Sequence, residues 1–125
     1  METYSFNREF DVIVAGDVIE HVENQGLFLS NIKKHLKKDG KLIITTPNAK
    51  WTTVFLKPNP THTLWHDIYT LRRILSLTGF SIDYYRYYFG NKKQYNFLQK
   101  ILTLRQSIIV IASINKMSNT NLVIC

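Results

Sequence analysis

The chain has 125 residues, 45% of them hydrophobic and 20% charged, and its 16 Lys and Arg against 9 Asp and Glu give a net charge of +7. This composition is typical of one folded domain over residues 1–125 and excludes a disordered chain. The single cysteine, Cys125, excludes an intramolecular disulfide and a cysteine metal site. Neither a signal peptide nor an apolar run of membrane-spanning length is recognised, so we expect a cytoplasmic protein.

The positive charge raises the question of a nucleic-acid partner. The basic residues are scattered, which is typical of solvated helix faces. A run of tyrosines adds the only further support, because aromatic side chains on a sheet can stack on bases; they are Tyr84, Tyr85, Tyr87 and Tyr88. Tyrosines of one strand more commonly divide between core and surface, so we do not expect nucleic acid to be the partner.

The first expected element is a strand over residues 11–15. Within it, Val12 to Ala15 are small and apolar without alternation, as in a central strand of a parallel sheet that is covered on both faces. Gly16 ends it, and Asp17, Glu20 and His21 follow within five residues. Ligands of open parallel sheets bind beyond the carboxyl ends of the strands, so the polar residues stand where a site is expected.

A helix is expected over residues 25–38, capped by Asn24 and ended by a left-handed glycine in the pair Asp39-Gly40. The β-branched run 41–46 predicts the second strand.

Residues 49–66 show no periodicity, and both a binding loop and a surface insertion remain open there. A helix over 71–78 with Thr70 as its cap, and strands over 80–88 and 107–114, complete the pattern. Residues 94–104 suit a short helix or loop insertion, and residues 115–125 form a polar tail. The fold class is therefore α/β.

Four motifs in this order resemble the second half of class I S-adenosylmethionine-dependent methyltransferases, in the small-molecule branch with the ubiquinone-biosynthesis O-methyltransferases. They are Phe10 to Val14, Asp17 to Val22, Leu36 to Leu42 and Thr46-Pro47-Asn48. The resemblance implies a partial Rossmann-like sheet, with strands 4, 5, 7 and 6 of a seven-stranded sheet, flanking helices and a core over about residues 10–114. It also implies a methyltransferase that methylates a small molecule on oxygen or carbon.

The sequence departs from that family in one respect. The glycine-rich loop that holds the cofactor, and the acidic residues that follow the family's second and third strands, have no counterpart among these 125 residues. We therefore expect the isolated chain to bind S-adenosylmethionine poorly and to be inactive alone. The alternative is an inactive fragment that acts as an interaction module, or as a subunit beside a chain that supplies the N-terminal half of the fold.

The resemblance assigns roles to the residues after the first strand. It places Gly16, Asp17 and Val18 beside the cofactor, with Gly16 leaving room for close approach. Glu20 and His21 lie on the substrate side, where a histidine is suited to accept a proton at neutral pH. Asp17 as a helix cap and His21 as a hydrogen-bonded histidine at the start of a helix are the structural alternatives.

The same resemblance implies that Asn48, Trp51, His62 and His66 line the substrate side. Asn48 is equally well explained as a turn residue. Some relatives bind a divalent metal here, which would use Asp17, Glu20 and His21 with one of the two later histidines. A metal is the less favoured expectation, because Asp17 stands where we expect a longer glutamate. The methyl acceptor and the oligomeric state stay open.

Overall fold

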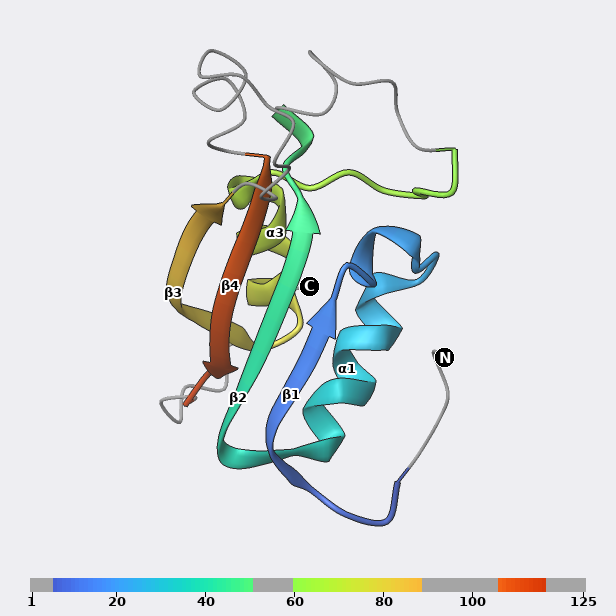
Figure 1. The fold of residues 1–125 in the computed structure, drawn as a ribbon. Coiled ribbons are helices and arrows are strands. Elements are labelled where there is room, and N and C mark those ends of the chain that lie inside the picture. Colours follow the sequence, from blue (N-terminus) through green and yellow to red (C-terminus); the bar gives the residue numbers. More distant parts are fainter. Residues whose placement is uncertain (1–5, 51–59, 89–105, 117–125) are drawn as a thin grey trace, which may run out of the picture.

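The computed structural model describes residues 6–50, 60–88 and 106–116. Within these ranges the chain forms a four-stranded sheet in the order β1-β2-β4-β3 (Figure 1). β1 and β2 are parallel, whereas β4 is antiparallel to both β2 and β3. The strands are β1 (Phe10–Gly16), β2 (Leu36–Pro47), β3 (Phe80–Tyr88) and β4 (Ser107–Ile114). The predicted α/β class and the partial Rossmann-like strand order are confirmed.

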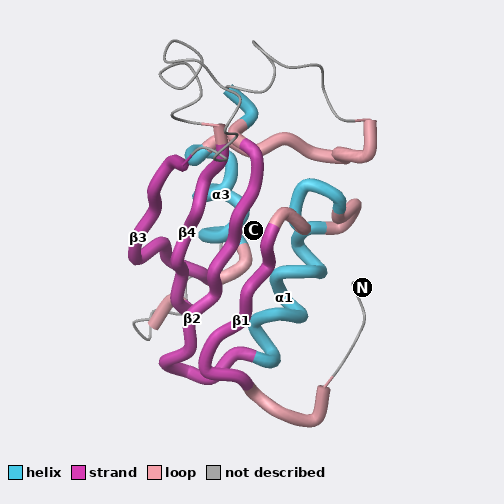
Figure 2. Tube along the Cα trace, viewed as in Figure 1, coloured by secondary structure: helices cyan, strands magenta, loops and turns pink. Residues whose placement is uncertain are grey.

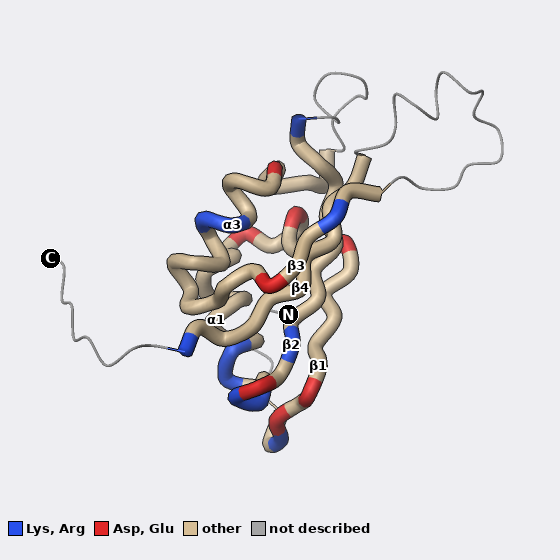
Figure 3. Tube along the Cα trace, turned by 90° about the vertical axis from the view of Figure 1, so that its left-hand side faces the viewer, with Lys and Arg blue, Asp and Glu red and all other residues tan. Residues whose placement is uncertain are grey.

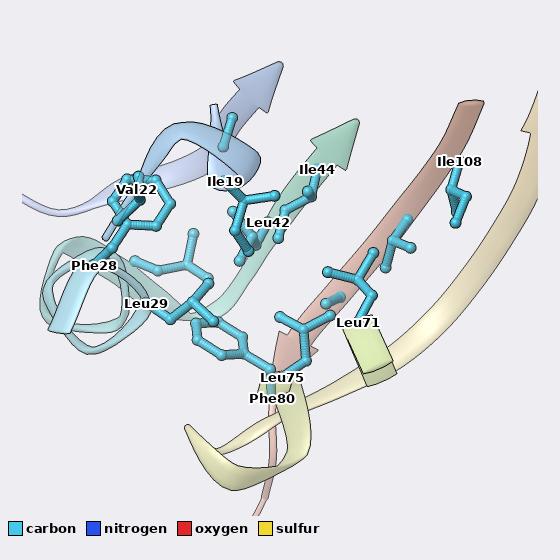
Figure 4. Close-up of a cluster of buried hydrophobic side chains, with 14 of the residues drawn as sticks. Ile19, Val22, Phe28, Leu29, Leu42, Ile44, Leu71, Leu75, Phe80 and Ile108 are labelled. Carbon is cyan, nitrogen blue, oxygen red and sulfur yellow. The ribbon is translucent and has the colours of Figure 1, made fainter. Parts of the chain in front are cut away.

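The two helices whose full length lies within the described residues cover one face of the sheet, as the edge-on view in Figure 3 shows. They are α1 (Gln25–His35), which connects β1 to β2, and α3 (Ile68–Leu77), which precedes β3. The core forms between them and the sheet (Figure 4), and its fully buried large side chains include Ile19, Leu29, Leu42, Ile44, Leu71, Leu75, Phe80 and Ile108. The burial of these side chains supplies the main stabilisation of the domain.

The predicted boundary between the first helix and the second strand is wrong. α1 ends at His35 and β2 begins at Leu36, so residues 36–40 belong to the strand. Gly40 is not a left-handed helix cap: a Cβ there would lie 2.8 Å from Leu36 Cδ1 and 2.9 Å from the Lys37 carbonyl oxygen. Glycine is therefore required by close packing at an irregular register, where Phe10 pairs with Leu36 and Val12 with Lys41.

The predicted cap of the second helix is also displaced. α3 begins three residues earlier than expected, and Asp67 caps it by accepting from Thr70 N at 2.8 Å, while Thr70 Oγ1 accepts from Asp67 N. This reciprocal capping lowers the pKa of Asp67, and the hydrogen bond from the Thr70 backbone N–H is the largest cause. Gly79, at φ +88°, follows the helix in the left-handed conformation that its sequence position predicts. Asn24 caps α1 as predicted, accepting from Leu27 N.

Several predictions fall outside the described residues. They are the short helix or loop over 94–104, most of the tail 115–125, and Trp51. Among the described helices, none is long and apolar enough to cross a membrane.

Candidate functional site

The loop over residues 60–67 passes beyond the carboxyl ends of β1 and β2 before α3 begins (Figure 2). We call this stretch the cover loop. The polar residues of the site lie on this loop and on the turn that follows β1. A short 3-10 turn, η1 (Ile19–His21), follows β1 and presents Glu20 and His21. The Glu20 carbonyl accepts from Thr63 N at 2.8 Å, from Thr63 Oγ1 at 3.0 Å and from Leu64 N at 3.3 Å. These bonds fix the cover loop on the turn.

Glu20 is only 2% exposed, which is unusual for a carboxylate. Its Oε2 accepts from Thr46 Oγ1 at 3.1 Å, and Thr46 itself is fully buried at the end of β2. Its Oε1 has no hydrogen-bond partner among the described residues. A buried carboxylate with one unsatisfied oxygen is costly unless a proton, a donor or a cation meets it, so this oxygen marks a place for a ligand.

His21 and His62 lie against each other across the turn and the cover loop. Their ring centroids are 4.7 Å apart in an edge-to-face arrangement. His21 Nδ1 is 3.0 Å from the Thr61 carbonyl oxygen, which can only accept, so Nδ1 carries the proton. Nε2 is then the ring nitrogen available to take a proton or bind a metal.

Glu20, His21 and His62 together form a candidate metal centre. One ligand atom from each residue lies within 4.8 Å of the others. A carboxylate with two imidazoles suits zinc, manganese or ferrous iron better than magnesium, which prefers oxygen ligands. This group includes neither Asp17 nor His66, contrary to the fuller set that the resemblance implies.

His66 lies at the other end of the cover loop and serves to anchor it. Its Nε2 is 3.0 Å from Gln25 Oε1, and Gln25 Nε2 donates to the Ile19 carbonyl at 2.8 Å. His66 is buried, and this burial lowers its pKa, so the ring is held neutral. Residues 48 and 66 also form a β-bridge. His66 therefore holds the cover loop against the start of α1 and the end of β2, and its ring makes no contact with His21.

The residues expected beside the cofactor end β1 and begin the turn. Asp17, at φ +51°, donates from its backbone N to the Thr45 carbonyl at 3.0 Å, and its Oδ1 accepts from Thr45 Oγ1. The side chain caps no helix, since Val18 holds the N-cap position of η1, so the capping alternative for Asp17 is wrong. A Cβ at Gly16 would meet only Thr45 Oγ1, at an ordinary 3.6 Å. Internal packing therefore does not require glycine there, and the open space fits close approach by a ligand.

Three residues of the site escaped the sequence reasoning. Thr46 was assigned to a strand and to the Thr46-Pro47-Asn48 motif but to no role in the site, Gln25 only to a helix start, and Thr63 to no role. Their partners lie 26 to 43 residues away in the chain, and no motif links them. Asn48 is buried after β2, beside this site rather than at an exposed turn.

A family match and the relatives found in comparison with known proteins agree on one family. Residues 1–85 match the family described as a methyltransferase domain. The ubiquinone biosynthesis O-methyltransferase of Rickettsia conorii is 42% identical over 48 residues, which are 38% of this chain and 17% of the relative. The mitochondrial ubiquinone biosynthesis O-methyltransferase of Rattus norvegicus is 34% identical over 97 residues, with 66% of this chain and 28% of the relative covered. The chain thus spans less than a third of these relatives.

Solved structures show the same fold. An S-adenosylmethionine-dependent methyltransferase from Mesorhizobium loti superimposes with a TM-score of 0.68 at 14% identity. The superposition covers 90% of this chain and 65% of the other. At this identity the likeness concerns the fold alone. About a third of the Mesorhizobium chain has no counterpart here.

Proposed function

Because the chain belongs to the methyltransferase domain family, with the partial Rossmann-like fold of its class I members, we propose that it serves S-adenosylmethionine-dependent methylation of a small-molecule hydroxyl. The observation that carries this proposal is the cluster of Glu20, His21 and His62 beyond the carboxyl ends of β1 and β2. The printed name of the Rickettsia relative, an O-methyltransferase, supports oxygen as the atom methylated.

The proposed roles follow from the geometry. His21, with its Nδ1 proton bonded to the Thr61 carbonyl, takes the proton of the acceptor hydroxyl on Nε2. His62 orients the acceptor, and the Glu20 carboxylate stabilises the positive charge that develops on His21. Methyl transfer depends mainly on alignment of the donor and acceptor and on exclusion of water.

The cofactor is proposed to approach Gly16, Asp17 and Val18. The open space on Gly16 supports this placement, and the positive φ of Asp17 turns the chain away from β1 at that point. Since the chain spans less than a third of its relatives, we propose that the other parts of the cofactor site lie outside residues 1–125, and that this chain alone binds the cofactor weakly.

A divalent cation is a second proposal for the same residues. The Oε1 of Glu20 and the Nδ1 of His62, which have no hydrogen-bond partner in the described part of the chain, are donor atoms of the right kind. When bound, such a cation would lower the pKa of an acceptor hydroxyl. Titration of the chain with Zn²⁺ tests it: Glu20→Gln is expected to weaken binding about tenfold or more, while Glu23→Gln, an exposed neighbour, leaves it unchanged. Equal affinities for both variants would reject the cation.

A chimera tests the methyl transfer. Residues 10–78 of this chain replace the corresponding stretch of the Rickettsia relative, and transfer to that enzyme's own acceptor is followed with labelled S-adenosylmethionine. We expect the chimera to be active, and His21→Gln to lower kcat about a hundredfold. Glu23→Gln serves as the control. An active chimera that tolerates His21→Gln would contradict the role of His21, and a folded, cofactor-binding chimera without transfer would contradict the function.

A further inference from the structure

The edge of β1 carries a row of backbone groups with no strand beside it. Among the described strands β1 pairs only with β2, so its other edge is free. Its residues are nevertheless apolar on both faces, as in an interior strand: Val12 and Val14 on one, Ile13 and Ala15 on the other. Edge strands of independent domains are usually protected by charges, prolines or bulges. In β1 the charge of Asp11 and the register irregularity between Phe10 and Val12 lie at the beginning of the strand, and Ile13 to Ala15 carry no such feature.

An apolar cavity of about 460 Å³ lies along this free edge. It is lined by Phe10 and Ile13 of β1, by Phe28 and Ile32 of α1, and by Phe6 ahead of the strand. Nearly all of its lining is carbon, which makes it a poor site for water and a good one for apolar side chains.

The face of the sheet opposite the helices adjoins this cavity at Val12, which lines the cavity and lies on the same face of β1 as Val14. The strand registers place Val14 beside Ile43, Ile43 beside Ile111, and Ile111 beside Tyr84, so that one apolar row crosses all four strands. Val14 is 66% and Tyr84 51% exposed. A contiguous apolar strip of this kind indicates a binding surface.

We propose that the free edge of β1, its cavity and this apolar row together dock a polypeptide that carries the remaining strands of a methyltransferase sheet. The partner adds a strand to β1, inserts apolar side chains into the cavity and covers Val14 and Ile43. That the partner is part of a methyltransferase rests on the proposed function; the docking surface itself does not. Its support is the third of the Mesorhizobium fold that has no counterpart here, while 90% of this chain is matched.

The net charge argues against a second copy as the occupant. Pairing two copies through β1 would bring together two chains that each carry +7. A partner that is neutral or acidic on the facing side meets no such repulsion. Salt bridges do not block the strand itself, since the Lys37–Asp11 pair lies at its beginning and both side chains are at least half exposed.

Sedimentation and titration calorimetry test the docking without cofactor or acceptor. The probes are the parts of the Rickettsia and Rattus relatives that precede their matched stretches, each produced as a separate polypeptide. We expect a one-to-one complex with at least one probe. Val14→Lys is expected to weaken it about tenfold or more, because a charge would be buried without a partner. Leu77→Lys, a residue of α3 with the same exposed fraction of 66%, is the matched control.

Hydrogen exchange of the unmodified chain gives a second measurement: the amides of β1 should gain protection in the complex. Failure of both probes to bind overturns the proposal. So does a complex that Val14→Lys and Leu77→Lys weaken equally, or a dimer of this chain alone that Val14→Lys dissociates. A complex that forms without restoring methyl transfer would leave the docking intact and count against the proposed function only.

Discussion

Two regions of the molecule depart from the usual rule that apolar side chains are buried and polar ones exposed. One buries polar side chains, and the other exposes apolar ones. Beyond the carboxyl ends of β1 and β2, the polar residues Glu20, Gln25 and His66 are at most 6% exposed. On the open side of the same sheet, Val12 and Val14 are 49% and 66% exposed. Buried polar groups and exposed apolar patches are the departures that carry information about function.

The two regions differ in how far other parts of the chain satisfy their polar groups or cover their apolar side chains. The polar region is tied together by hydrogen bonds between the turn, the cover loop and the start of α1, and only single atoms such as Glu20 Oε1 lack a partner. The apolar side has no cover among the described residues. The polar region therefore suits a small ligand, and the apolar face suits the surface of a partner polypeptide.

Two adjacent isoleucines of β2 provide the largest expected contrast. Ile44 is fully buried under the helices, whereas Ile43 lies on the open face. Ile44→Ala should cost about 2–5 kcal/mol of unfolding free energy, through lost burial and an unfilled cavity. Ile43→Ala should cost less than about 1 kcal/mol, since water already reaches that face. Urea unfolding measures both, and equal losses would show that the open face is covered in the isolated chain.

Removal of the donor to Glu20 tests the polar region. Thr46→Val keeps the shape of the side chain but takes away the hydroxyl that bonds Glu20 Oε2. We expect the unfolding free energy to fall by about 1–3 kcal/mol, because the buried Glu20 carboxylate then loses its hydrogen bond from Thr46. Thr46→Ser keeps the hydroxyl and should lose clearly less. If the two variants were equally unstable, the methyl group of Thr46, and not its hydroxyl, would be the stabilising part.

The pH dependence of stability tests the anchor at His66. Burial lowers the pKa of His66 in the folded chain, so the unfolded chain binds a proton first as the pH falls below about 6.5. Stability should therefore fall as the pH drops from about 6.5 towards the lowered folded pKa. His66→Gln should flatten this part of the curve. Thermal unfolding across that range measures it, and an unchanged slope in His66→Gln would assign the dependence to other groups.

The smallest effect is expected on the open side. Val14→Thr should change the unfolding free energy by no more than about 0.5 kcal/mol, because Val14 is largely exposed and threonine is equally compatible with a strand. A loss well above this value in a urea unfolding curve would mean that Val14 is buried in solution. The apolar row would then belong to the interior of the isolated chain.

Much of the fold could be predicted from local patterns. The β-branched runs of β2 and β4 and the N-cap of α1 marked the elements, and the two errors at their boundaries have local causes. Gly40 was assigned to a helix end because glycine usually stands there, but it serves a close contact with Leu36 inside a strand. Asp67 was overlooked as a cap because Thr70, its partner in the capping box, is itself a residue type that caps helices.

The candidate site could be predicted only in part. Glu20 and His21 follow a strand directly, so their place at its carboxyl end is a local property. The choice of His62 over Asp17 as the third member of the cluster depends on where the cover loop crosses the turn. Trp51 lies outside the described residues, so its role at the substrate side stays a prediction.

By itself the amino-acid sequence determined the kinds of elements, their order and the polar end of β1, because propensity, capping and apolar periodicity act over a few neighbouring residues. Only the tertiary structure decided that His62 meets His21, that Gln25 holds His66, and that one apolar row runs from Val14 to Tyr84. Such contacts join residues some 25 to 70 positions apart in the chain, and they depend on strand register and on helix packing, which no local pattern specifies.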